Sequence, residues 1–562
     1  MGTISDKLMR IINTKEDIKQ ALISKGYDVP TSIPFKEYAK MILDLPCKVD
    51  SFPDIEGIVA RYSASGLTNE QMAANPVWVD KTGNGHDLQL KNFAWKGMSG
   101  VGGYGDENYQ TFYKFTLDDY VFIASPPGVK HMNFTFRVTG LQPRNKLTLT
   151  FFGTTNTVYG TWDKDGIYTV DADIVEAGKP TYFYNGYGAT RGEFTIEILP
   201  LYPGALVFDG VDDWAGCDNL PLLPKEKGYS IIALRNWITR YDATQYKRPL
   251  ISNLGTNDEG AFLIEYRKDE NVNDVTGSYN SFTDVYIDDN NPITWQTSSS
   301  YNGQIIKKGT SKSTNKLCIC KTYFGHLSNY ANAAIWEIVI LDHDATEEEL
   351  TKIKDYFVKT YPWLFPDQAW TVVGKTNEDE DRATIANITG NGNDLVCLNL
   401  GFIEGSGYNE EGEYAGYLVT DGVDDKITSS TFEMGNDWTV IGDWELINTG
   451  KNDNAGIVKF DSIVIYNYNS VLINIKNGRN ILIPDQNTVN AICSDGRIYS
   501  KDWKESIYNE ETESTSKNFL TIGYSGNAYT KIAFKNLAIY PTVLSREDCI
   551  KAYNYLQTLK AK

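Results

Sequence analysis

The sequence LVFDGVDD at residues 206–213 recurs as LVTDGVDD at residues 418–425. In both places an apolar run leads directly into Asp-Gly and then, after a valine, into a pair of aspartates. Asp-Gly supplies the positive-φ residue that a tight turn between strands needs, and an Asp side chain can cap the backbone of such a turn. The motif therefore predicts a strand followed by a capped turn, twice in one chain.

Two further pairs of segments recur in the same order around this motif. TGNGHDL at residues 82–88 matches TGNGNDL at residues 389–395, and AIWEIVI at residues 334–340 matches AFKNLAI at residues 533–539. Helix-like segments, residues 346–357 and 545–556, follow the last pair. Three matches in one order indicate two homologous domains.

Spacing locates an insertion in the first copy. Gly83 and Asp209 are 126 positions apart, whereas the matching Gly390 and Asp421 are only 31 apart. The extra segment has its own alternating strands, for example at residues 133–138 and 193–198, and its length suits an immunoglobulin-like β-sandwich. We expect the first sandwich at residues 48–98 and 203–365, the inserted sandwich at residues 99–202, and the second sandwich at residues 366–562.

Composition narrows the class of protein. The chain has 562 residues, 13% aromatic residues and a net charge of −20, which favours several β-rich domains and disfavours nucleic acid as a partner. We see no stretch long and apolar enough for a membrane span and no apolar segment of an export signal near Met1. The seven cysteines are spread without metal-site spacing, so we expect reduced thiols, with Cys318 and Cys320 as core residues.

Residues 1–47 differ from the rest of the chain. Apolar residues recur there at helical spacing, and a helical module of this size buries too little surface to be stable alone. We expect it to attach and oligomerise the chain through apolar side chains; the alternative is that the helices pack on the first sandwich. The residues expected to make this contact are Leu8, Ile11, Ile12, Ile18, Leu22, Phe35 and Tyr38.

The repeated segments resemble the concanavalin A-like lectin/glucanase superfamily, specifically its laminin-G-like group. The resemblance rests on the apolar strand that runs into FDGVDD and on the LSxED segment before the final helix (residues 544–548). The second copy departs at Thr420, where the usual aromatic residue is missing. The resemblance implies a mostly β chain with two jelly-roll sandwiches, one carrying the inserted immunoglobulin-like sandwich, behind a short α-helical module.

The N-terminal segment, with IINTK at residues 11–15 and GYDVP at residues 26–30, resembles the start of virion fibre and tail proteins of bacteriophages. With the lectin-like sandwiches, it implies a non-enzymatic head or tail fibre, or a decoration protein, located in the virion. Expected partners are other virion proteins, copies of the chain and host or mucus glycans. The alternative is a bacterial carbohydrate-binding protein or glycoside hydrolase of the same superfamily.

Three kinds of site follow from these readings. Glycosidases of the superfamily use a Glu-x-Asp-x-x-Glu pattern, and the nearest string, residues 171–176 (DADIVE), lies in the insertion and lacks the first Glu, so we expect no catalytic residues. The aspartates of the two DGVDD motifs could hold calcium, but turn capping explains them better, and no metal or other cofactor is expected. Aromatic residues of the insertion are the candidate glycan contacts, with strand packing or contact with a partner subunit as the alternative explanation; the candidates are Tyr182, Tyr184, Tyr187 and Trp162.

Overall fold

The protein is described from a computed structural model, and the chain divides into two units, residues 1–54 and 55–562. The structure describes residues 52–561 except 105–111, 116–119, 124–130, 142–146, 152–156, 164, 174–180, 186–193, 224–226, 239–246, 258–260, 268–290, 299, 302–303, 306–312, 323–328, 411–413, 448–454, 461–462, 468–470, 476–478, 484–488, 501–502, 504, 508–519 and 525–528. The predicted helical module at residues 1–47 lies outside the described residues, as do its attachment residues Leu8, Ile11, Ile12, Ile18, Leu22, Phe35 and Tyr38.

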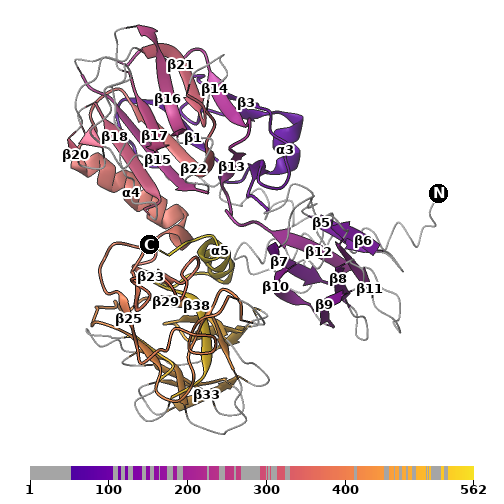
Figure 1. Cartoon of the computed structure of the whole chain (residues 1–562). Coiled ribbons are helices and arrows are strands. Elements are labelled where there is room, and N and C mark those ends of the chain that lie inside the picture. Colours follow the sequence, from indigo (N-terminus) through magenta and orange to yellow (C-terminus); the bar gives the residue numbers. More distant parts are fainter. Residues whose placement is uncertain are drawn as a thin grey trace, which may run out of the picture. The chain divides into compact units, whose positions relative to one another are not determined.

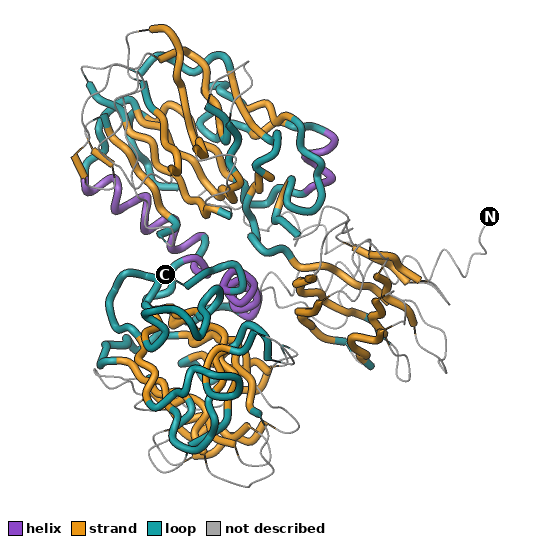
Figure 2. The backbone as a smooth tube through the Cα atoms, in the orientation of Figure 1, coloured by secondary structure: helices purple, strands orange, loops and turns teal. Residues whose placement is uncertain are grey.

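The chain is mostly β, as predicted (Figures 1 and 2). Its described strands pair antiparallel, as β13 with β22 and β27 with β38 illustrate. The first sandwich has one sheet built from β1 (Ile58–Ser63), β4 (Gly100–Val101), β13 (Leu206–Asp209), β15 (Ser230–Trp237), β18 (Ile293–Thr297), β19 (Ser300–Tyr301), β20 (Gln304–Ile305) and β22 (Asn332–Leu341). Its order is β20-β19-β18-β15-β22-β13-β4, and β1 pairs with β22.

The facing sheet contains β2 (Val77–Trp78), β3 (Leu88–Lys91), β14 (Trp214–Cys217), β16 (Lys247–Asn257), β17 (Leu263–Arg267) and β21 (Ser313–Ile319), in the order β17-β16-β21-β14-β3-β2. Leu206 and Ile335 of the first sheet and Leu90 and Ile319 of the second are buried in one hydrophobic core. Burial of this apolar surface, at roughly 25 cal/mol per Å2, holds the two sheets face to face.

The second sandwich repeats this plan. One sheet contains β23 (Gln368–Thr371), β26 (Gly407–Tyr408), β27 (Leu418–Val419), β29 (Thr439–Leu446), β34 (Val489–Cys493), β35 (Arg497–Ser500), β36 (Glu505–Ile507) and β38 (Ile532–Tyr540). The other contains β24 (Thr384–Ile385), β25 (Leu395–Leu398), β28 (Lys426–Ser429), β30 (Ala455–Phe460), β31 (Ile463–Asn467), β32 (Val471–Ile475), β33 (Arg479–Ile483) and β37 (Thr521–Ile522). The pairing of β13 with β22 recurs as the pairing of β27 with β38, so the predicted duplication is present in the sheet topology.

The missing aromatic residue of the second copy leaves this strand in place. The Phe208 ring contacts the Phe93 ring edge-on at 5.0 Å in the first sandwich. At the equivalent position the Thr420 hydroxyl donates to the Thr530 carbonyl at 2.7 Å and accepts from the Ile532 backbone N–H at 3.0 Å. Hydrogen bonds to the neighbouring strand thus take the place of an aromatic contact.

The inserted segment forms two further sheets. Their strands are β5 (Phe112–Phe115), β6 (Tyr120–Ile123), β7 (His131–Thr139), β8 (Leu147–Phe151), β9 (Thr157–Trp162), β10 (Gly166–Asp173), β11 (Thr181–Asn185) and β12 (Phe194–Leu199), in the orders β10-β7-β12-β5 and β6-β11-β8-β9. Phe136, Leu149, Phe183 and Ile196 are buried between them. The insertion therefore has its own core.

The insertion leaves the first sandwich through a hairpin that the second sandwich also has. Strand β4 pairs with β13, and the ladder continues as Gly102 N–H donates to the Ala205 carbonyl at 2.8 Å. In the second copy β26 pairs with β27, and Asn409 N–H donates to the Tyr417 carbonyl at 2.9 Å. Because β4 is a strand of the first sandwich, Gly100 and Val101 belong to that sandwich although they lie inside the predicted insertion, residues 99–202.

Both helices predicted behind the repeated strands are present: α4 (Glu347–Thr360) and α5 (Arg546–Leu556). The side chain of Thr346 caps α4 by accepting from the Glu349 N–H, and Ser545 caps α5 by accepting from the Asp548 N–H. A third described helix, α3 (Asn69–Ala74), begins at the N-cap Thr68. None of the helices in the described part of the chain combines the length and apolar character of a membrane span.

Candidate functional site

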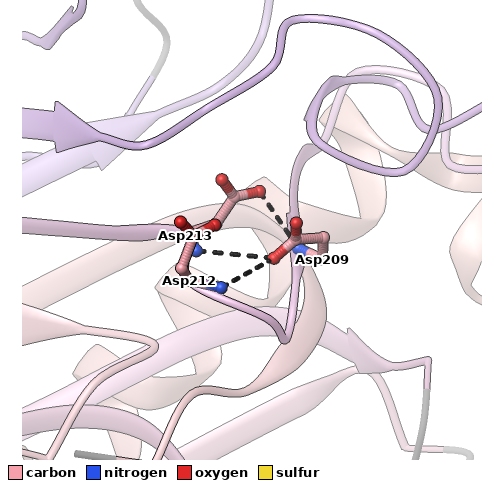
Figure 3. Close-up of side chains that lie close together, drawn as sticks. All are labelled: Asp209, Asp212 and Asp213. Atoms are coloured by element: carbon pink, nitrogen blue, oxygen red, sulfur yellow. Dashed lines mark hydrogen bonds between the residues drawn. The ribbon is translucent and has the colours of Figure 1, made fainter. Parts of the chain in front are cut away.

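The DGVDD motif of the first sandwich forms the turn between β13 and β14 (Figure 3). The Asp209 Oδ1 accepts backbone N–H groups from Val211, Asp212 and Asp213 at 2.8, 3.3 and 3.4 Å. In return, the Asp213 Oδ2 accepts the Asp209 N–H at 3.1 Å. Gly210 has a φ of +77°, and a Cβ atom there would lie 2.7 Å from the Asn332 Cβ. The turn capping expected from the sequence is therefore present, and only glycine fits at its tip.

The second DGVDD motif forms the same turn between β27 and β28. The Asp421 Oδ1 accepts from Val423, Asp424 and Asp425 at 2.7, 3.3 and 3.4 Å, and the Asp425 Oδ2 accepts the Asp421 N–H at 2.8 Å. Gly422 repeats the φ of +77°. Two turns more than two hundred residues apart thus share one set of hydrogen bonds.

A neighbouring loop supports each turn, and sequence reasoning missed it. The Asn92 Nδ2 donates to the Asp212 carbonyl at 2.9 Å, and the Asn399 Nδ2 donates to the Asp424 carbonyl at the same distance. Both asparagines have a positive φ. A signal was available, because each asparagine lies seven positions after the last glycine of the repeated TGNG segment.

Burial changes the protonation of the innermost aspartates. Asp213 and Asp425 are both fully buried. Desolvation, with the nearby Asp209 charge as a further cause, raises the pKa of Asp213 to about 7, and desolvation also raises the pKa of Asp425. Among the described residues, no hydrogen-bond donor contacts the Asp213 Oδ1 or the Asp425 Oδ1. Asp213 therefore gains or loses its proton nearer to neutral pH than an exposed aspartate does, and the pKa of Asp425 is shifted in the same direction.

These turns were also the metal candidates. One oxygen from each of Asp209, Asp212 and Asp213 lies within 4.8 Å of the others, and Asp421, Asp424 and Asp425 repeat this grouping. Calcium takes six to eight oxygen ligands, whereas the Asp209 Oδ1 and the Asp213 Oδ2 already accept backbone N–H groups. The described residues thus support turn capping, and we assign no metal to them.

A lysine and aromatic rings lie beside each turn. In the first sandwich, the Lys321 Nζ lies 4.3 Å from the centroid of the Trp214 ring and 5.5 Å from that of Tyr330. In the second, the Lys426 Nζ lies 5.3 Å from the centroid of Tyr524, whose ring lies 4.7 Å from that of Tyr529. We call Trp214, Lys321 and Tyr330 the first cation–aromatic cluster, and Lys426, Tyr524 and Tyr529 the second.

The strand registers show that the two clusters occupy equivalent positions. Trp214 and Lys426 each begin the strand that follows the turn. Lys321 and Tyr524 each follow the strand paired with it, two positions beyond Ile319 and Ile522, which pair with Ala215 and Ile427. The bridge between Lys321 and Tyr330 recurs between Tyr524 and Tyr529. The lysine and its aromatic partner have therefore exchanged places between the copies.

The aromatic residues expected to bind glycans lie elsewhere. Trp162 is half-buried, and its ring contacts those of Phe136 at 5.0 Å and Tyr168 at 5.5 Å, beside the core of the inserted sandwich. Tyr182 and Tyr184 are residues of β11, but their side chains lie outside the described residues, as does Tyr187. Trp162 thus packs against the core of the inserted sandwich, and the glycan contacts at Trp162 and the three tyrosines stay predictions.

The DADIVE segment at residues 171–176, the nearest match to a glycosidase pattern, lies partly on β10. Asp171 and Asp173 lie on β10, an edge strand of the insertion, opposite Asn133 and His131, and Glu176 lies outside the described residues. The six cysteines in the described part of the chain are buried free thiols. Cys318 and Cys320 are among them, as predicted for core residues.

Comparisons with known proteins find only distant structural similarities. No family model matches the sequence, and no curated protein does. Among solved structures, a Trypanosoma rangeli sialidase complex is 7% identical with a TM-score of 0.23, over 40% of this chain and 41% of that one, so the chain spans less than half of its length. The receptor-binding domain of botulinum neurotoxin type G is 13% identical with a TM-score of 0.21, over 34% of this chain and 50% of that one.

One sequence-based expectation is corrected by these comparisons. We expected a chain without enzymatic activity, yet several of the similar structures are sialidases, which are enzymes. The expectation of a non-enzymatic protein is therefore withdrawn. Likenesses with TM-scores of 0.21 to 0.23 carry no argument about activity, so no catalytic residue or substrate is transferred from the sialidases to this chain.

Proposed function

We propose that this protein is a structural virion protein of a tailed bacteriophage, a head or tail fibre or decoration protein whose sandwiches contact host or mucus glycans. The observation that carries the proposal is the repetition of one turn with one kind of cation–aromatic cluster in two sandwiches of a single chain. Repeated weak sites raise the overall strength of binding by on the order of 100- to 10,000-fold when they engage together. Display on a particle multiplies this effect.

The placement in the virion is supported by the sequence of the N-terminal segment, which resembles phage attachment segments, and the glycan contact by the lectin-like sandwiches. In this proposal residues 1–47 join the chain to the capsid or tail and to its own copies, and residues 55–562 face outward. A net charge of −20 suits an outward role, because it keeps the chain soluble and away from the packaged nucleic acid.

The placement is tested on purified particles. Antibodies raised against the whole chain should label head or tail appendages in negative stain, and mass spectrometry of gradient-purified particles should detect the chain in a fixed ratio to the major capsid protein. Particles that lack both the label and the peptides would refute the virion role. Release of reducing ends from the bound glycans would be measured separately, because it reports activity rather than location.

A further inference from the structure

Ring contacts, and no hydrogen bond to a described residue, are found for the ammonium groups of Lys321 and Lys426. Lys321 is only 5% exposed, and among the described residues no carbonyl, carboxylate or hydroxyl oxygen accepts a hydrogen bond from its Nζ. An ammonium group carries three donors, and burial of most of the Lys321 side chain without an acceptor for them costs free energy. Burial accordingly lowers the pKa of Lys321. Contacts with aromatic faces offset only part of this cost.

The lysine and the aromatic residue have exchanged positions between the two sandwiches, while the contact between them is present in both. At one position Trp214 stands where the second copy has Lys426, and at the other Lys321 stands where the second copy has Tyr524. Packing alone does not require lysine at either position, because an apolar side chain of similar volume stabilises a buried site as well or better. A lysine held against a ring is therefore the feature that both sandwiches have retained, and its free donors require another explanation.

An exposed carboxylate completes each cluster. The Asp212 side chain is exposed. Burial is the main cause that raises the pKa of Tyr330, and the negative charge of Asp212 is the second. Its equivalent, Asp424, is also exposed. Trp214, Tyr330, Tyr524 and Tyr529 are half-buried. Each site thus combines free N–H donors, a carboxylate acceptor and aromatic surface within one loop cluster.

These groups match the chemistry of a sugar ring. The hydroxyl groups of a saccharide both donate and accept hydrogen bonds, while its C–H faces pack on aromatic rings. Charge selects among saccharides, because three aspartates stand beside one lysine in each loop cluster and the chain as a whole carries −20. This balance repels an anionic sugar and favours a neutral one.

We propose that both cation–aromatic clusters are binding sites for neutral saccharides. The lysine Nζ donates to sugar oxygens, the exposed aspartate of the turn accepts from a sugar hydroxyl, and the aromatic rings contact the C–H face. This inference rests on the proposed contact with glycans and deepens it by naming the site and the ligand class.

Calorimetric titration of the whole chain tests the proposal. The probes are chitohexaose, maltohexaose and mannohexaose as neutral oligosaccharides and hexagalacturonate as the acidic one. We expect a neutral oligosaccharide to bind at two sites per chain. Each single variant, Lys321→Met or Lys426→Met, should reduce the stoichiometry to one, and the double variant should weaken binding at least tenfold. Lys359→Met, which alters an exposed lysine near the end of α4, is the matched control and should bind as the native chain does.

A second pair of variants guards against misfolding. Asp212 and Asp424 are exposed and their carboxylates make no hydrogen bond to described residues, so Asp212→Asn with Asp424→Asn should leave melting unchanged while weakening the same binding. Unaltered binding by both double variants would overturn the proposal, as would binding of hexagalacturonate alone or of none of the four probes. Because particle labelling is measured independently, such a result would leave the virion role standing.

Discussion

Trp214 and Lys426 lie at equivalent positions of the two sandwiches, because each is the first residue of the strand that follows a DGVDD turn. Trp214 contacts a lysine, whereas Lys426 contacts an aromatic ring. Lys321 lies over the Trp214 ring at 4.3 Å, whereas Lys426 lies over the Tyr524 ring at 5.3 Å. The contact between a cation and a ring has therefore been kept while its two residues changed places.

This relationship predicts the outcome of a double-mutant cycle in the first sandwich. Trp214→Lys alone places two ammonium groups together without the Trp214 ring between them, and Lys321→Tyr alone removes the cation. Each single variant should lower the free energy of unfolding by about 1 kcal/mol or more, in line with the strength of such contacts. The double variant should recover about half of the summed loss or more, because it recreates the arrangement of the second sandwich.

Urea unfolding of all four proteins measures the coupling. The matched control is the reciprocal exchange in the second sandwich, Lys426→Trp with Tyr524→Lys, which should show coupling of the same sign. Additive losses in both sandwiches would mean that the two residues do not act as a pair.

Much of the fold follows from the sequence. The repeated segments predicted both sandwiches, because β13 with β27 and β22 with β38 carry the apolar runs that central strands need when both of their faces are buried. The insertion was detectable from spacing alone. The start of the insertion was not detectable in this way, because β4 is only two residues long and shows too little alternation to be recognised as a strand.

The cation–aromatic clusters could not be predicted in this way. Lys321 and Trp214 are far apart in the sequence, and the exchange aligns Trp214 with Lys426 and Lys321 with Tyr524, so a comparison of the copies finds mismatches at both positions. For Trp162 the sequence pattern did not distinguish a packed ring from an exposed one. An aromatic residue in an alternating strand has the same sequence pattern whether its ring faces solvent or rests on Phe136.

Stability of the first sandwich should depend on pH through Asp213. Its folded pKa of about 7 lies above the ordinary value of 3.8, so the folded state binds the proton more tightly than the unfolded state does. The stabilising contribution is complete below about pH 4 and is lost as the pH rises through 7. A difference of one in pKa corresponds to about 1.4 kcal/mol, so we expect a loss of a few kcal/mol between pH 5 and pH 8.

Asp213→Asn tests this assignment, because its amide is neutral at every pH. Calorimetric melts at pH 5 and pH 8 should show a transition that shifts in the native chain and shifts much less in the variant. Asp425→Asn serves as the control and should affect a different transition, since Asp425 is buried in the second sandwich. An equal pH shift in the native chain and in Asp213→Asn would assign the dependence to other groups.

The insertion should be replaceable by the short loop of the second sandwich. Gly102 and Ala205 are hydrogen-bonded as Asn409 and Tyr417 are, so residues 410–416 should join them when they replace residues 103–204. The chimera should melt cooperatively. It should lose about 1 to 3 kcal/mol, because the Trp336 Nε1 loses the Pro203 carbonyl and the ring loses its contact with Tyr202.

The matched variant is deletion of residues 99–202 with Met98 joined to Pro203, which also removes β4 and should be less stable than the chimera. Calorimetry compares the two. A chimera that melts without cooperativity while the longer deletion folds would show that the hairpin is misassigned.

Removal of residues 1–47 should abolish assembly and leave the sandwiches folded. The apolar residues expected to make the attachment lie in that segment, whereas the described cores are built from residues of the second unit. Light scattering should show a monomer, and complemented particles should lack the truncated chain. Native oligomeric mass and normal incorporation would place attachment elsewhere.

Capture of intact particles on an immobilised neutral oligosaccharide, the one that binds the isolated chain most tightly, tests the central claim most directly. Particles that carry the native chain should be retained, and particles that carry Lys321→Met with Lys426→Met in every copy should be retained at least tenfold less. Lys359→Met particles should behave as the native ones do. Equal retention of native and doubly altered particles would contradict the account.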